Sequence, residues 1–179
     1  ASFQAAATAG GKVQDCVEDF ENTTPGYFVV GFNDPLTQSV PNGPYPTGLR
    51  CPLTVQSNLM GNGGASPQPR GGNGLAAVEQ GAGFGETSDI VVANYFVDGY
   101  DLIISDPAIS AVGFNTLAVF GPGSGRIQIY DTSNLLVGTF NSAANAGGSN
   151  YFGYIHSAGI GRVNIFDTSL ANAEGADNI

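Results

Sequence analysis

Residues 126–140, which read RIQIYDTSNLLVGTF, carry the pattern that decides the fold. In 126–130 the apolar residues Ile127 and Ile129 alternate with polar residues, as a strand with one buried face requires. Residues 130–135 combine Asp, Thr, Ser and Asn, which is the composition of a tight turn. A second apolar run follows over 135–140, so the stretch predicts a β-hairpin.

Further segments of the same kind fill the rest of the chain, each rich in Val, Ile, Phe or Tyr and bounded by Gly, Asn, Asp or Pro. No stretch of 12 or more residues shows the period of a helix. The sequence therefore predicts an all-β fold, an antiparallel two-sheet β-sandwich of the jelly-roll kind. The predicted strands are 27–33, 51–57, 89–97, 100–105, 109–120, 126–131, 135–140, 151–156 and 162–166, with long loops over 34–50 and 58–74.

Composition limits what this chain does. It has 179 residues, 27 glycines, 10 prolines, no tryptophan and a net charge of −10 with only five basic residues. Binding to nucleic acid needs clustered Lys and Arg, so we expect no nucleic-acid partner. No apolar stretch is long enough to span a membrane. The length predicts a single domain over 15–179, preceded by an extension over 1–14.

The chain is poor in catalytic groups, and we expect that it is not an enzyme. His156, its one histidine, stands next to Ser157 in a predicted strand, where neighbouring side chains point to opposite faces. The sequence holds no nucleophile elbow. Paired carboxylates are present, but a glycosidase also needs aromatic subsites, and tryptophan is absent.

Cys16 and Cys51 are the only two cysteines. They stand in no metal-binding pattern, which leaves two buried thiols or one disulfide. We favour the disulfide, because the remaining composition is typical of a secreted, extracellular protein.

An acidic cluster lies beside the first cysteine, at Asp15, Glu18, Asp19 and Glu21. Calcium takes six to eight oxygen ligands, which such loops supply. The plain alternative is a solvated turn.

Two short stretches, CVEDFE at 16–21 and GADNI at 175–179, resemble the first and last strands of jelly-roll domains related to carbohydrate-binding modules. That resemblance implies one structural calcium held by Glu21 and Asp177, with Glu18 or Asp19 as a further ligand.

A second resemblance is to secreted bacterial surface proteins of the PEP-CTERM-sorted kind. It is carried by ANYF at 93–96, AVGFN at 111–115, IYD at 129–131, NLLVGT at 134–139 and GADNI at 175–179. It implies a β-sandwich that acts at the cell surface.

Residues 1–14 are small and almost uncharged, with an isolated Phe3. We predict that they join subunits by adding a strand to a neighbour's sheet, with Phe3 as a subunit contact. The favoured function is therefore a non-catalytic structural or adhesive protein that forms a homopolymer, a filament. The alternative is a calcium-stabilised carbohydrate-binding module whose partner is a polysaccharide, held by the tyrosines Tyr95, Tyr100, Tyr151 and Tyr154.

Overall fold

The computed structural model describes residues 2–14, 16–21, 26–28, 51, 53–58, 76–80, 87–93, 99–118, 125–142, 149–167, 174–177 and 179. These residues form one short helix and a series of strands. The elements are α1 (Phe3–Ala9), β1 (Gly26–Phe28), β2 (Leu53–Asn58), β3 (Ala76–Gln80), β4 (Asp89–Ala93), β5 (Gly99–Ile104), β6 (Ala111–Ala118), β7 (Gly125–Tyr130), β8 (Leu136–Asn141), β9 (Ser149–Ile155), β10 (Arg162–Asp167) and β11 (Glu174–Asp177).

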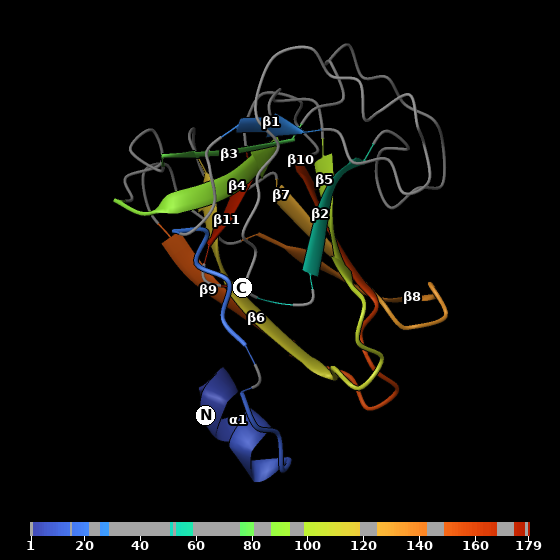
Figure 1. The fold of residues 1–179 in the computed structure, drawn as a ribbon. Helices are drawn as coiled ribbons and strands as arrows, with labels where there is room; N and C mark the ends of the chain where they lie inside the picture. Colours follow the sequence, from blue (N-terminus) through green and yellow to red (C-terminus); the bar gives the residue numbers. More distant parts are fainter. Residues whose placement is uncertain are drawn as a thin grey trace.

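The strands form two sheets that face each other (Figure 1). The six-stranded sheet has the order β1-β3-β4-β11-β6-β9, and the five-stranded sheet has the order β2-β5-β10-β7-β8. Every strand pairing between described residues is antiparallel. The predicted all-β, two-sheet sandwich is therefore confirmed.

The core follows the alternation seen in the sequence. Ile127 and Ile129 of β7 are fully buried, whereas Arg126 and Gln128 beside them are only partly buried. Ile127 lies across from Ile165 of β10 in the antiparallel register. The apolar faces of both sheets thus meet in one cluster: Phe20, Leu53, Val55, Val91, Tyr100, Leu102, Val112, Phe114, Ile127, Ile129, Ile160, Val163, Ile165 and Ala176.

The hairpin predicted over 126–140 is present as β7 and β8, and its turn has the expected chemistry. The Asp131 carboxylate accepts hydrogen bonds from the N–H groups of Ser133 and Leu135, at 2.8 and 2.9 Å. Asn134 has φ of 60°, a left-handed conformation that Asn adopts more readily than most residues.

Two elements were not predicted. β3 contains two alanines, a glutamate and a glutamine with a single valine, so it lacks the usual density of β-branched residues. α1 is only seven residues long, shorter than any helix that a periodic pattern can establish. The first residue of the loop predicted over 58–74 is the last residue of β2. The rest of that loop, the loop predicted over 34–50 and the later part of the strand predicted over 27–33 lie outside the described residues.

α1 lies at the N-terminal end of the chain, below the two sheets in the view of Figure 1. Within the described part of the chain, no helix is long and apolar enough to cross a membrane.

Candidate functional site

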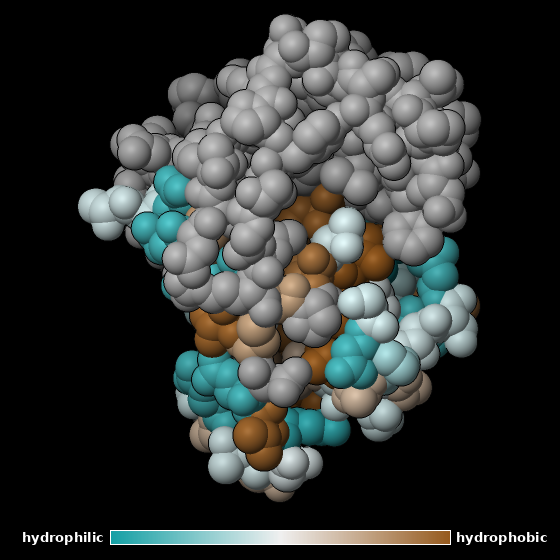
Figure 2. All heavy atoms as spheres, in the orientation of Figure 1, coloured by the Kyte–Doolittle hydropathy of each residue, from teal (hydrophilic) through white to brown (hydrophobic). Residues whose placement is uncertain are grey.

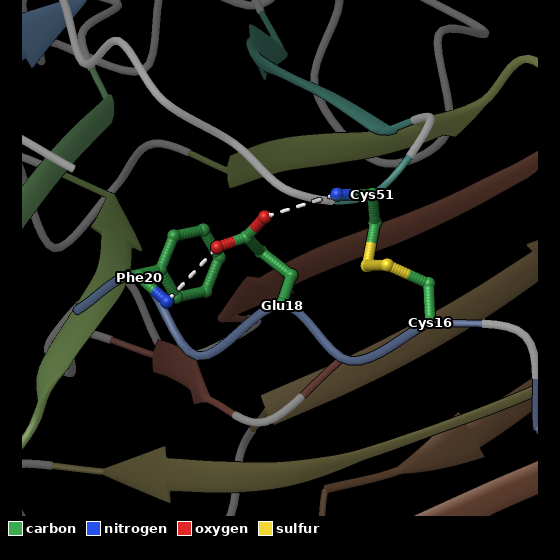
Figure 3. Close-up of a disulfide and its surroundings, with 4 residues drawn as sticks. All are labelled: Cys16, Glu18, Phe20 and Cys51. Carbon is green, nitrogen blue, oxygen red and sulfur yellow. Dashed lines mark hydrogen bonds between the residues drawn. A yellow bond between two sulfur atoms is a disulfide. The ribbon is translucent and has the colours of Figure 1, made fainter. Parts of the chain in front are cut away.

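The first feature of the site is a disulfide that joins Cys16 to Cys51, as predicted. The two cysteines are 35 residues apart in the sequence, and their Cα atoms lie 5.6 Å apart. Figure 3 shows that the bridge ties the segment after α1 to the start of β2. The disulfide therefore closes a covalent loop at the point where the N-terminal segment meets the sandwich.

Glu18 lies beside this bridge and is fully buried (Figure 3). One carboxylate oxygen, Oε1, accepts a hydrogen bond from the N–H of Phe20 at 3.0 Å. The other, Oε2, accepts one from the N–H of Cys51 at 3.3 Å. Phe20 is a buried residue with φ of 58°, a strained conformation for a bulky side chain. The carboxylate thus fixes both this turn and the second half of the disulfide.

The last residue of the chain lies next to the same segment. The N–H of Glu18 donates to the carbonyl of Ile179 at 2.8 Å, and the N–H of Ile179 donates to the carbonyl of Glu18 at 3.0 Å. The resemblance to jelly-roll domains implied that residues near both ends would meet, and this pairing brings them together.

Glu21, three residues after Glu18, forms an acidic pair with Asp89. Oε1 of Glu21 accepts a hydrogen bond from the N–H of Asp89, the first residue of β4, at 2.8 Å. Burial raises the pKa of the Asp89 carboxyl, and the negative charge of Glu21 raises that pKa further. Two carboxylates that repel each other at the surface are a suitable pair of oxygen ligands for a divalent cation.

The other predicted metal ligands have different surroundings. Oδ1 of Asp19 accepts a hydrogen bond from the N–H of Glu21 at 3.3 Å. The backbone of Asp177 pairs with Asn115 in the six-stranded sheet, next to Ala176, which pairs with Val91 of β4. The side chain of Asp177 lies outside the described part. Among described residues, no group of three or more His, Cys, Asp or Glu side chains is arranged around a common point.

The N-terminal segment forms the second feature. Ser2 caps α1, because its hydroxyl accepts a hydrogen bond from the N–H of Ala5 at 3.2 Å. None of the seven residues of α1 is buried. Phe3 lies over two glycines that pair across β6 and β9, Gly113 and Gly153. Its ring also contacts Tyr151, with 5.7 Å between the ring centroids.

This arrangement differs from the extended donor strand that the sequence suggested. Residues 3–9 are helical, and Phe3 contacts its own sheet. The alanines explain the difference, since Ala has the highest helix propensity and follows a Ser that caps the helix.

An open cleft of about 660 Å³ separates the N-terminal segment from the sandwich. The floor of the cleft is apolar and includes the disulfide. Its wall is formed by α1 and by residues 11–14 that follow the helix. In Figure 2, hydrophobic residues are visible on this face between the grey region and the N-terminal end. The apolar floor comprises Cys16, Cys51, Leu53, Ile104, Ile109, Val112 and Ile179.

The three described tyrosines among those predicted to stack on sugars do not form a common surface. Tyr100 is fully buried in the core, so that prediction is wrong for this residue: no face of its ring reaches solvent. Tyr154 is half-buried between Phe140 and His156, with ring centroids 5.2 and 6.3 Å away. Tyr151 is 49% exposed. Tyr95 lies outside the described residues.

Asp89, Gly113 and Gly153 were not among the predicted site residues. The glycine pair could not be found without the register of β6 and β9, because the two residues are 40 positions apart and meet only by strand pairing. The acidic pair could not be found from the sequence for the same reason, since Glu21 and Asp89 are 68 positions apart and meet only in the folded chain.

Comparison with solved structures identifies similar folds. The K2 cleaved adhesin domain of Lys-gingipain superposes with a TM-score of 0.51 over 91% of this chain and 94% of that chain, at 14% sequence identity. The K1 cleaved adhesin domain of Lys-gingipain from Porphyromonas gingivalis W83 gives a TM-score of 0.48 over the same shares, at 12% identity. An arabinoxylan arabinofuranohydrolase of glycoside hydrolase family 43 from Bacillus subtilis gives a TM-score of 0.35, covering 50% of this chain and 20% of that chain at 20% identity.

No protein-family model and no curated protein sequence matches the chain. At this level of identity, the K2 domain shows that the two proteins share a fold.

Proposed function

We propose that this chain is a non-catalytic, extracellular β-sandwich that assembles with copies of itself through residues 1–14, as a structural or adhesive protein. The observation that carries the proposal is the N-terminal segment, which contacts the sandwich through Phe3 and leaves most of its residues exposed. α1 buries none of its residues, and Val13 after it is 89% exposed. The apolar floor of the cleft beside this segment is contiguous, and contiguous apolar surface is a common mark of a protein–protein contact.

The extracellular location is supported by the disulfide, since such bridges form and persist in oxidising compartments. The adhesive role is drawn by analogy from the K2 domain of Lys-gingipain, whose name describes an adhesin and whose fold is similar. The PEP-CTERM kind of surface attachment rests on the sequence resemblance.

We also propose that Glu21 and Asp177 bind one calcium ion, with Asp89 as a neighbouring ligand. Support comes from the pairing of Glu18 with Ile179 and from the hydrogen bond between Glu21 and Asp89. Bound there, calcium would neutralise the acidic pair.

The carbohydrate-binding alternative has weaker support, because one of its four tyrosines lies in the core and another packs between aromatic neighbours.

The proposal is tested by comparing the full chain with a variant that lacks residues 1–12. We expect the full chain to form oligomers or filaments as its concentration rises, in analytical ultracentrifugation and electron microscopy. The shortened variant keeps Cys16, Cys51 and every strand, so we expect a folded monomer. A full chain that sediments as a monomer at millimolar concentration with calcium present would overturn the proposal.

A further inference from the structure

We propose that Phe3 from a second copy of this chain can occupy the Phe3 slot, so that neighbouring subunits exchange their N-terminal segments. The Phe3 slot is the depression formed by Gly113, Gly153 and Tyr151. This inference rests on the proposed self-assembly and names the surface at which it takes place.

The slot matches an aromatic ring because its floor lacks side chains. Gly113 and Gly153 lie directly opposite each other in the register of β6 and β9. A Cβ atom on Gly113 would meet the hydroxyl of Tyr151 first and would lie 2.9 Å from Cε1 of Phe3. A Cβ atom on Gly153 would lie 2.9 Å from the Cβ of Phe3 and still closer to its ring. Tyr151 forms the wall, with its ring inclined by 50° to that of Phe3. Any larger residue at either glycine would fill the space that the ring takes.

Little else fixes the segment to its own subunit. A helix of seven residues is marginal in water without tertiary contacts. The cleft of about 660 Å³ shows that residues 4–14 do not pack closely on the sandwich, although protein interiors are normally filled. The docked state therefore depends mainly on Phe3 in its slot.

The chain after α1 has the features of a hinge. Gly11 has φ of 71°, a left-handed conformation that glycine adopts without strain. Cys16 is fixed by the disulfide, so movement is confined to the residues before it. The segment from residue 4 to residue 15 spans up to about 40 Å when extended, enough to reach a slot on an adjacent subunit.

Two arguments favour a second copy as the partner. An exchanged segment keeps the contact between Phe3 and its slot, which makes such swapping a low-cost route to oligomers. The segment is also the part of the chain that opposes association least, because residues 1–14 contain Lys12 and no acidic residue while the whole chain carries −10. Val13, 89% exposed in the single subunit, would then have a second surface on which to pack.

A disulfide-trapping experiment tests the exchange. One preparation carries Phe3→Cys and the other Gly153→Cys; the native cysteines are paired, so the new thiols are the only free ones. The two Cβ positions are 2.9 Å apart, and a small outward shift brings them to roughly 3.5 Å, within the range of a disulfide. We expect the mixed, oxidised preparations to give a disulfide-linked dimer that contains one chain of each kind.

Two controls accompany it. The double variant F3C/G153C should close within one chain when dilute, which establishes that the thiol introduced at position 3 still reaches the slot. Mixing Phe3→Cys with Thr139→Cys, an exposed position on β8 of the other sheet, should give only collisional background.

A photoreactive residue keeps the aromatic ring in place. Phe3→p-benzoylphenylalanine, mixed with isotopically labelled wild-type chain, should cross-link to a labelled β9 peptide identified by mass spectrometry. If the protein assembles in the ultracentrifuge, but the mixed cysteine variants give no dimer above background and the photoreactive residue cross-links only within its own chain, exchange is wrong and another surface carries assembly. If the protein stays a monomer, both this inference and the proposed self-assembly are wrong.

Discussion

Glu18 shows how one buried charge organises the start of the sandwich. Its two carboxylate oxygens accept hydrogen bonds from the N–H groups of Phe20 and Cys51, which are far apart in the sequence. A buried carboxylate with hydrogen-bonded oxygens is tolerated in a protein interior, whereas an unpartnered one is costly.

Glu18→Gln should lower stability. The amide replaces one acceptor oxygen with an NH2 group, which would then face an N–H donor. We expect a loss of about 1–3 kcal/mol in the free energy of unfolding, measured by urea denaturation in EDTA so that bound calcium has no influence. Asp19→Asn is the matched control, since the hydrogen bond that Asp19 accepts from the N–H of Glu21 is exposed to solvent, and it should change stability by less than about 0.5 kcal/mol. Equal effects of the two substitutions would contradict this role for Glu18.

Asp89 gives a prediction that depends on pH and calcium. Its raised folded-state pKa means that it favours folding below its ordinary pKa of 3.8, and that this contribution is lost as the pH rises through the raised value. At neutral pH without calcium, Asp89→Asn should therefore raise Tm, and the difference should disappear below pH 3.8.

In calcium, the difference in Tm between the wild type and Asp89→Asn should change sign. It should raise the Tm of the wild type more than that of Asp89→Asn, and should leave Asp177→Asn almost unchanged, because a ligand stabilises only the state that binds it. Thermal unfolding in EDTA and in calcium chloride measures both effects. An unchanged wild-type melting curve on addition of calcium would exclude the site.

At the scale of elements, the packing of α1 on β6 and β9 depends on the glycine at position 153. Gly153→Ala places a methyl group where the ring of Phe3 lies, so the helix should detach while the sandwich stays intact. Full burial of a phenylalanine contributes about 1.5–3 kcal/mol. Phe3 is only partly buried, so we expect its contact to contribute about 1 kcal/mol, which corresponds to roughly 5-fold in the docking equilibrium.

Lys-C digestion measures that change, because Lys12 is the only lysine in the chain. For dilute monomer, cleavage after Lys12 should accelerate about 5-fold in Gly153→Ala and in Phe3→Ala. Gln4→Ala, on the exposed part of the same helix, should leave the rate unchanged. Equal rates in all four proteins would show that Phe3 does not hold the helix.

The strands that the sequence predicted best are those with an alternating pattern and clear turn residues. In β7, the burial of Ile127 and Ile129 follows directly from that alternation. β3 was missed because pairing with β1 and β4, and not its own residues, makes it a strand. α1 could have been suggested by Ser2 followed by a run of alanines, a known N-cap pattern.

The candidate sites were less predictable. The disulfide could be inferred because only two cysteines are available. The Phe3 slot and the Glu21–Asp89 pair depend on which strands lie side by side, which composition and periodicity do not specify.

For the molecule as a whole, the disulfide closes a loop that spans a large part of the first third of the chain. Replacing both cysteines, as Cys16→Ser with Cys51→Ser, should lower the free energy of unfolding by about 4 kcal/mol, the chain-entropy value for a sequence separation of 35. Urea denaturation measures the loss, and the wild type reduced with dithiothreitol should behave like the double variant. A loss below about 1 kcal/mol would mean that other contacts already hold these ends together.

The position of this bridge has a mechanical consequence. If subunits are linked through residues 1–14, tension along a filament enters each sandwich at Cys16. The covalent bond passes that force directly to Cys51 and into β2 of the five-stranded sheet. The intervening chain, with a sequence separation of 35 and an extended length of roughly 120 Å, is shielded from the load and cannot be drawn out while the bridge is intact. Reduction would thus convert a stiff link into an extensible one.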